Sequence, residues 1–280
     1  MTGGPNTPLT SAIEKSGYPF ALAVERELRM LAEKHGWPVV LREVPVGDAF
    51  ADLVLQQPGL LLVLECKRVE EEMWHFLVPK GTSTNTARCR VEWRNPRAAQ
   101  PPSILSVSLN PPSKIFCSEC TMAEGSYESS VAVLPRGKAA HSLEQLSGGL
   151  LDMTHRLGDQ FGLQYDDEVP TYLIPVIVTN AGLSVCEYDV GTLPIETGRL
   201  GEVEFTSVDF LRFRKTLVRR ASNDYQGDRK LFLRQWTADR ERTVFVVSPR
   251  GLDQFLAGFR AFGPWGEHKY PFEFEHPPKW

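Results

Sequence analysis

A chain of 280 residues is long for one domain and short for two, and its 42% hydrophobic and 24% charged residues are typical of a globular protein. The net charge of −4 argues against a protein that coats nucleic acid with its whole surface. The longest apolar run, at 59–65, is too short to cross a bilayer, and the N-terminus does not read as a signal peptide. Five cysteines without a disulfide pattern favour a reducing setting, so we expect a soluble, cytoplasmic protein with no membrane partner.

The first part of the chain has the pattern of a helix followed by a meander. Residues 1–16 are rich in Gly, Pro and Thr, and we expect them to be disordered. Apolar residues then recur at spacings of four and three, which predicts a helix over 18–35 that Gly36 ends. Three strands separated by turn residues are expected next, at 39–44, 50–55 and 60–66.

The rest of the chain alternates irregular and periodic segments. Residues 70–136, with scattered prolines, read as an irregular insertion whose best strand candidates are 104–109 and 130–134. A helix is expected at 139–161, and a strand pair at 172–179 and 183–188 joined through the turn at 180–182. The remaining predictions are a basic helix at 208–220, a strand at 243–247, a helix at 251–262 and a tail at 264–280.

Acidic and basic side chains end the apolar runs of the second and third predicted strands. If their turn centres on 58–59, Asp52 faces Glu65 across an antiparallel ladder, on one side of the sheet. A slip of one residue would turn Asp52 to the other face. Lys67 projects from the same face as Glu65, whereas Cys66 between them points into the core.

Two carboxylates set opposite one another destabilise a sheet unless something compensates their charge, and a divalent cation is the simplest compensation. Carboxylate oxygens suit Mg²⁺ or Mn²⁺, which would activate water for phosphodiester hydrolysis, and Lys67 would stabilise the developing charge. In the structural alternative, Glu65 and Lys67 form a solvated strand end and Asp52 lies near a turn.

An Asp followed thirteen positions later by Glu-x-Lys resembles the signature of the PD-(D/E)XK nuclease superfamily, and here it is Asp52, Glu65 and Lys67. Residues 24–40 look like the first helix and strand of its archaeal Holliday-junction resolvase and Mrr-like branches. The resemblance implies that Glu25 is a further metal ligand beside Asp52 and Glu65. This sequence departs from the pattern at Ala51, where the family usually has Pro, and in the length of the insertion.

The segment 205–245 carries ten Lys or Arg against five Asp or Glu, which suggests a face for a polyanion. The predicted helix 208–220 offers the candidates for nucleic-acid contact, which are Arg212, Arg214, Lys215, Arg219 and Arg220. A solvated charged helix is the alternative. Trp74 and Trp93, among arginines, suggest either a stacking surface or an aromatic core beneath the insertion.

Cys117 and Cys120 have half the spacing of a zinc site, but no second pair follows, so we expect ordinary thiols and no structural zinc. The predicted fold is α/β: a restriction-endonuclease-like αβββαβ core with a mixed sheet, a long insertion after the third strand and a C-terminal helical extension. The core would span 17–200 with its insertion at about 70–136, and the basic extension at 201–263 would pack on it.

The predicted function is metal-dependent hydrolysis of nucleic-acid phosphodiester bonds, with Mg²⁺ or Mn²⁺ as cofactor and DNA favoured over RNA. A role in bacterial defence or repair is what the resemblance implies. One alternative is a binding or interaction subunit that keeps the nuclease fold but does not cut, and another is an RNase. The sequence leaves open a homodimer or a subunit of a larger system.

Overall fold

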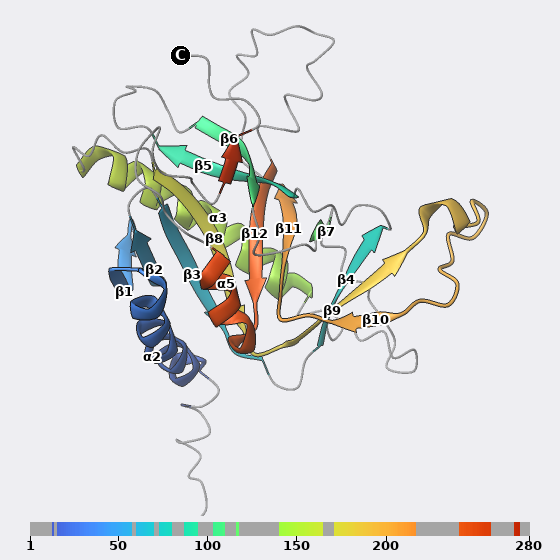
Figure 1. Cartoon of the computed structure of the whole chain (residues 1–280), viewed down its shortest axis with the longest axis horizontal. Helices are drawn as coiled ribbons and strands as arrows, with labels where there is room; N and C mark the ends of the chain where they lie inside the picture. Colours follow the sequence, from blue (N-terminus) through green and yellow to red (C-terminus); the bar gives the residue numbers. More distant parts are fainter. Residues whose placement is uncertain are drawn as a thin grey trace, which may run out of the picture.

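The computed structural model describes residues 13, 16–57, 60–69, 73–79, 87–94, 103–109, 116–117, 140–164, 171–216, 241–258 and 272–274. In this part of the chain a mixed β-sheet lies between helices on its two faces (Figure 1). The expected α/β class and mixed sheet are confirmed. The expected disordered segment falls mainly on residues 1–12 and 14–15, which lie outside the described residues.

The first helix, α2 (Tyr18–His35), has the predicted bounds. Its apolar stripe buries Val24 and Leu28 against the sheet, and Gly36 ends it with φ at 75°, a left-handed conformation that suits glycine. The predicted meander follows as β1 (Val39–Val46), β2 (Ala49–Gln57) and β3 (Leu60–Lys67). Both of its pairings are antiparallel.

The sheet continues beyond the meander through strands that are distant in sequence. Next to β3 lies β8 (Thr171–Thr179), which is parallel to it. The sheet then continues through β12 (Glu241–Val247), β11 (Phe210–Thr216) and β7 (Phe116–Cys117). All nine residues of β8 are buried, as expected for a central strand with neighbours on both sides and helices over both faces.

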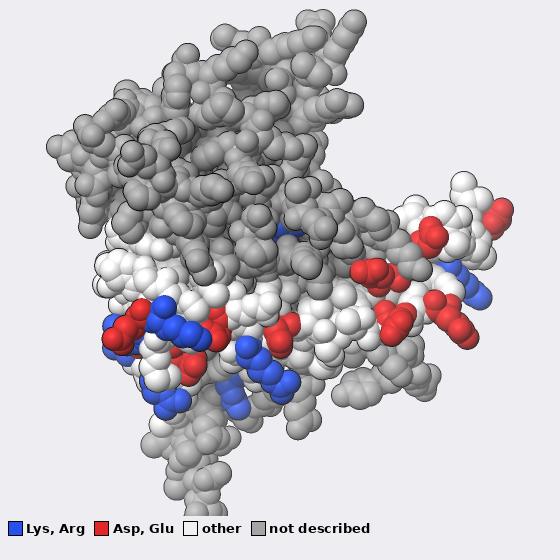
Figure 2. Space-filling view, in the orientation of Figure 1, with Lys and Arg blue, Asp and Glu red and all other residues white. Residues whose placement is uncertain are grey.

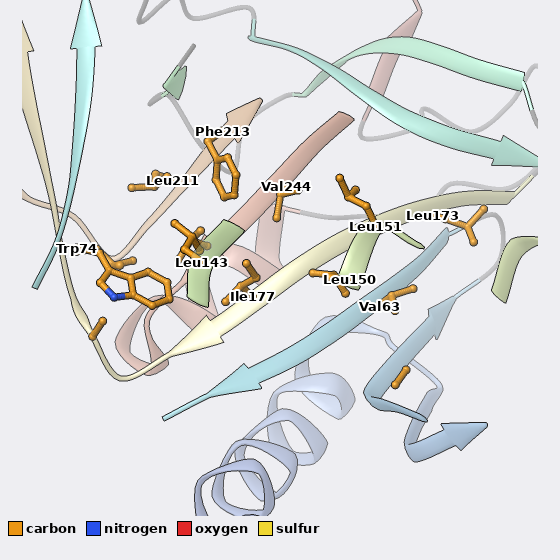
Figure 3. Close-up of a cluster of buried hydrophobic side chains, with 14 of the residues drawn as sticks. Val63, Trp74, Leu143, Leu150, Leu151, Leu173, Ile177, Leu211, Phe213 and Val244 are labelled. Atoms are coloured by element: carbon orange, nitrogen blue, oxygen red, sulfur yellow. The ribbon is translucent and has the colours of Figure 1, made fainter. Parts of the chain in front are cut away.

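The two faces of the sheet carry separate cores. On one face, α2 and α5 (Leu252–Gly258) pack on Leu53, Leu62 and Val176. On the other, α3 (Ala140–Gln164) covers Val63, Ile177 and Val244, as Figure 3 shows. Each leucine buried in this way stabilises the fold by roughly 1.5–3 kcal/mol. The predicted helix at 139–161 is therefore confirmed, and the predicted helix at 251–262 forms over its first part.

The insertion contributes strands to both sheets of the protein. These are β4 (Met73–Pro79), β5 (Ala87–Arg94), β6 (Ser103–Leu109) and the short β7. Strand β5 pairs with β8 and β6, so the insertion extends the main sheet. The predicted strand at 104–109 is confirmed within β6, whereas 130–134 lies outside the described residues.

The predicted strand pair after α3 is wrong in its pairing, although both strands exist. Strand β9 (Gly182–Tyr188) leaves the main sheet and joins β4 and β10 (Phe205–Ser207) in a second, three-stranded sheet. The side chain of Asn180 explains the divergence: it accepts from the backbone N–H of Val69 at 2.7 Å and donates to the Val69 carbonyl at 2.8 Å. These bonds hold the chain between the two strands to the segment after β3 instead of closing a hairpin.

The predicted basic helix at 208–220 is also wrong, because residues 210–216 form β11. Leu211 and Phe213 alternate toward the α3 core, and β11 pairs with β12 along seven residue pairs. The backbone groups of residues 210–216 thus find hydrogen-bond partners in β12. This tertiary pairing overrides the helical preference that the local sequence indicated. The extension thus completes the main sheet.

The predicted tail is corrected in one place, since β13 (Phe272–Phe274) pairs antiparallel with β6. Two short 3-10 turns, η2 (Val190–Thr192) and η3 (Pro249–Gly251), complete the described elements. In the described part of the chain, none of the helices combines the length and the apolar character needed to span a membrane.

Candidate functional site

Asp52 and Glu65 lie on adjacent antiparallel strands, in the register that the turn at 58–59 predicts. The ladder between β2 and β3 runs from Gln57 opposite Leu60 to Leu53 opposite Leu64. Asp52 therefore follows directly opposite Glu65. There the Asp52 carboxylate, not a backbone carbonyl, accepts the backbone N–H of Cys66 at 2.7 Å. The predicted juxtaposition of these two residues is confirmed.

The pKa values of both carboxylates are raised. Burial raises the pKa of Glu65 to about 7, with a further contribution from the charge of Asp52 and an opposing one from Lys67. Burial also raises the pKa of Asp52, although the hydrogen bond from Cys66 opposes this and the charge of Glu43 adds to it. Two half-buried acids of the same sign thus lie where a positive charge would relieve both.

Lys67 lies two residues beyond Glu65 on β3, and its charge lowers the pKa of Glu65. The side chain of Cys66, by contrast, packs against the core beneath α2, as alternation along the strand predicts. Burial raises the pKa of the Cys66 thiol strongly, and the charges of Asp52 and Glu65 raise it further. The thiolate, which is the nucleophilic form, is therefore disfavoured at this position.

Glu25, the expected third acidic ligand, forms ion pairs with two arginines. Its Oε1 accepts from Nη2 of Arg29 at 2.7 Å, and its Oε2 lies 3.3 Å from Nη1 of Arg42. Arg42 is opposite Leu53 in the sheet, so this ion-pair network lies on the α2 side. Within the described residues, no group of three or more His, Cys, Asp or Glu is arranged to hold a metal ion. The structure brings Asp52 and Glu65 together without Glu25.

Glu43 is a neighbour of the site that the sequence reasoning missed. It lies on β1 between Arg42, opposite Leu53, and Val44, opposite Ala51, which places it beside Asp52. Its charge raises the pKa of Asp52, and its φ of 50° is a conformation that non-glycine residues rarely adopt. A two-residue turn at 47–48 pairs Val46 with Ala49, and counting back along both strands from that pair would have predicted Glu43 beside Asp52 from the sequence.

The predicted basic face does not form as expected. Arg212 is only 1% exposed in β11, so it cannot contribute to a surface in this fold. Lys215 is half-buried near the end of the same strand. The side chain of Arg214 and the whole of Arg219 and Arg220 lie outside the described residues. On the face in Figure 2, Lys and Arg mix with Asp and Glu over α2, and acidic residues predominate over the connection between β9 and β10.

The sequence also singled out two tryptophans and a pair of cysteines in the insertion. Trp74 is fully buried in the core beneath α3, which confirms the core interpretation for this residue (Figure 3). The side chain of Trp93 and both Cys117 and Cys120 as possible ligands lie outside what the structure describes.

His155 has partners that the sequence did not reveal. Its Nδ1 lies 3.0 Å from Glu92 Oε2, and its Nε2 lies 3.6 Å from Asp159 Oδ2. Arg242 approaches the same Glu92 at 3.4 Å. Glu92 and Arg242 are buried, so this network ties β5, α3 and β12 together beneath the surface.

A cavity of about 310 Å³ adjoins Glu65. It lies between α3 and the turn that joins β1 to β2, so the candidate carboxylate forms part of its wall. At its rim, Arg156 of α3 donates to Asp48 of the turn at 2.7 Å and pairs with Asp152 at 2.7 Å. The site thus combines a buried carboxylate pair, a lysine and an adjoining cavity.

Comparison with protein-family models, with curated proteins and with solved structures finds no match to this chain.

Proposed function

We propose that this protein is a metal-dependent nuclease that hydrolyses phosphodiester bonds in nucleic acid, with DNA favoured over RNA. The observation that carries the proposal is that Asp52 and Glu65 lie next to each other where the ladder between β2 and β3 ends, with Lys67 on the same strand as Glu65. Two neighbouring acids whose pKa values are both raised, chiefly by burial, form an unfavourable arrangement by themselves, and such arrangements are common at functional sites.

The residues present fit a hard divalent cation. Asp52 and Glu65 offer carboxylate oxygens from adjacent strands, and Mg²⁺ is commonly bound through one or two carboxylates, with water and substrate phosphate as its other ligands. When bound, Mg²⁺ or Mn²⁺ would neutralise charge on the scissile phosphate and acidify a water molecule. Glu25 is the third ligand that the family resemblance implies, and its pairing with Arg29 and Arg42 makes a two-carboxylate site the simpler proposal.

The proposed roles of the side chains follow from their positions. The Cys66 N–H orients the Asp52 carboxylate by holding one of its oxygens, which would leave the other oxygen available to a metal ion. Glu65 supplies the second carboxylate from the opposite strand. The Lys67 ammonium stabilises negative charge that develops on the phosphoryl group and positions the attacking water.

The order of elements supports the restriction-endonuclease-like interpretation of the fold. Helix α2 is followed by β1, β2 and β3, and after the insertion by α3 and β8, which is the order αβββαβ. We assign the activity to the cytoplasm, where the thiols of Cys66 and Cys186 would remain reduced, and to defence or repair, as the resemblance to PD-(D/E)XK nucleases implies.

The second candidate is a non-cleaving nucleic-acid-binding subunit with the same fold. One observation favours it: Arg29 and Arg42 occupy both oxygens of Glu25, so a possible third ligand is neutralised. Binding that falls steeply with salt, without turnover in Mg²⁺ or Mn²⁺, would support this alternative.

The test is a cleavage assay with linear, circular and single-stranded DNA and structured RNA, in Mg²⁺, in Mn²⁺ and in EDTA. Asp52→Asn and Lys67→Met are expected to abolish cleavage. Glu33→Gln, an exposed change on α2, is the matched control and should cleave like the wild type. Cleavage retained in both site variants would overturn the proposal, as would the absence of metal-dependent cleavage of every substrate.

A further inference from the structure

The cavity beside Glu65 has two kinds of wall. Its apolar walls come from Val46 of β1 and from Leu146, Leu150 and Met153 of α3. Its polar groups are Glu65 at the sheet and the Arg156 ion pairs at the rim. A volume of about 310 Å³ is at the lower end of the range for small-molecule sites. The cavity therefore offers apolar walls to an uncharged group and a cation at its rim to an anionic one.

Gly149 of α3 opens this cavity. It lines the space, and a Cβ built on it would meet no atom within 4 Å. A glycine in a helix interior destabilises it by about 1 kcal/mol relative to alanine, so the small residue has a cost. Its neighbour Gly148 also has open space around a Cβ but does not line the cavity. Substituting each of the two glycines in turn therefore separates an effect on helix stability from an effect on the shape of the cavity.

Arg156 places a cation at the rim. Its guanidinium lies over the turn at Gly47, whose φ is 64°, with 3.3 Å between Nη1 and an ideal Cβ at that position. The side chains of its partners Asp48 and Asp152 are 88% and 38% exposed, and that of Arg156 is 45% exposed. Exposed ion pairs of this kind contribute little to stability, so a phosphate at the rim would compete with Asp48 for the Arg156 guanidinium while Asp152 keeps its own pair with Arg156.

We infer that the cavity holds one unpaired nucleotide of the substrate, with its base between the aliphatic walls and its phosphate at Arg156. The inference rests on the proposed function, because it places this nucleotide next to the phosphodiester at Glu65. A base that is stacked and paired within a duplex cannot enter such a cavity, since it would first have to leave the helix. The substrate class is therefore single-stranded or splayed nucleic acid, such as a flap or a frayed end.

The test compares Gly149→Leu with Gly148→Leu. Binding of a short fluorescein-labelled oligothymidylate and of a labelled hairpin duplex is measured by fluorescence anisotropy in Ca²⁺, and cleavage of both is measured in Mn²⁺. Gly149→Leu should fill the cavity and weaken single-strand binding by about tenfold or more. Gly148→Leu should bind like the wild type, and thermal melts of both variants report whether they fold.

The outcomes separate this inference from the proposed function. Unchanged single-strand binding and cleavage in Gly149→Leu, or equal losses in both leucine variants, would overturn the cavity assignment even where Asp52→Asn abolishes cleavage. A wild type that binds and cuts only duplex would overturn it as well. Selective loss of binding in Gly149→Leu supports the cavity, and if Asp52→Asn still cleaves, the nuclease site alone is wrong.

Discussion

The carboxylate of Asp52 accepts the backbone N–H of Cys66, the residue next to Glu65, at the point where the ladder between β2 and β3 ends. This one bond sets the position of Asp52 relative to the opposite strand. The bond also makes it possible to separate the two contributions of the Asp52 side chain, its hydrogen-bond acceptor and its negative charge, because an amide oxygen can accept the same bond but carries no charge.

We therefore expect Asp52→Asn and Asp52→Ala to differ in their free energy of unfolding, and we expect both variants to lose metal binding. Asn keeps the acceptor for Cys66, whereas Ala removes it and should cost about 1 kcal/mol in the free energy of unfolding. Saturating Mn²⁺ should raise the melting temperature of the wild type and of neither variant. Urea unfolding and thermal melts with and without Mn²⁺ test this. An equal rise in melting temperature in all three proteins would exclude Asp52 as a ligand.

Glu65 should make the stability of the metal-free protein depend on pH. Its pKa is raised from 4.5 to about 7 in the folded state, so the folded protein keeps a proton that the unfolded chain releases. The resulting stabilisation is complete below about pH 4.5 and is lost as the pH rises through about 7. Glu65→Gln cannot lose that proton, so relative to wild type it should gain on the order of 3 kcal/mol between pH 4.5 and 8.

Urea unfolding in EDTA at several pH values measures this difference. Glu33→Gln serves as the exposed control, and its stability relative to wild type should stay constant over the same range. A Glu65→Gln variant whose relative stability does not change with pH would contradict the environment that the fold assigns to this carboxyl group.

Glu43 and Glu25 should differ in their effect on metal affinity. The charge of Glu43 acts on Asp52, so Glu43→Gln should weaken Mn²⁺ binding several-fold, to an extent that falls with added salt. The charge of Glu25 is neutralised by Arg29 and Arg42, so Glu25→Gln should bind Mn²⁺ nearly as the wild type does. Titration calorimetry measures the Mn²⁺ affinity of both variants and of the wild type. Loss of binding in Glu25→Gln alone would identify the helical glutamate as a ligand.

The Glu92 network should be important for stability. Glu92→Ala would leave Arg242, which is 7% exposed, without its buried carboxylate, and such losses cost about 3–5 kcal/mol. Glu187→Ala, an exposed change on β9, is the control and should stay within about 0.5 kcal/mol of wild type. Denaturant unfolding of both variants measures the effect. A cost below about 1 kcal/mol for Glu92→Ala would show that the network does not hold β5 to the core.

Local patterns in the sequence determined much of the fold and the centre of the site. Helical spacing and Gly36 predicted α2 with its bounds, and turn residues predicted the meander. The register of β2 on β3 follows from the turn at 58–59, so the pairing of Asp52 with Glu65 was predictable. These features depend on residues close together in the chain, where periodicity and turn chemistry act directly.

Only the tertiary structure decided which distant segments became partners. Residues 210–216 became a strand because β12 pairs with them, and Arg212 was buried as a result. Strand β9 left the main sheet because Asn180 binds Val69, a contact across more than a hundred residues. Glu25 met Arg42 only when α2 packed on the sheet. Pairing and burial across such separations depend on the free energy of the whole packed chain, which no local pattern contains.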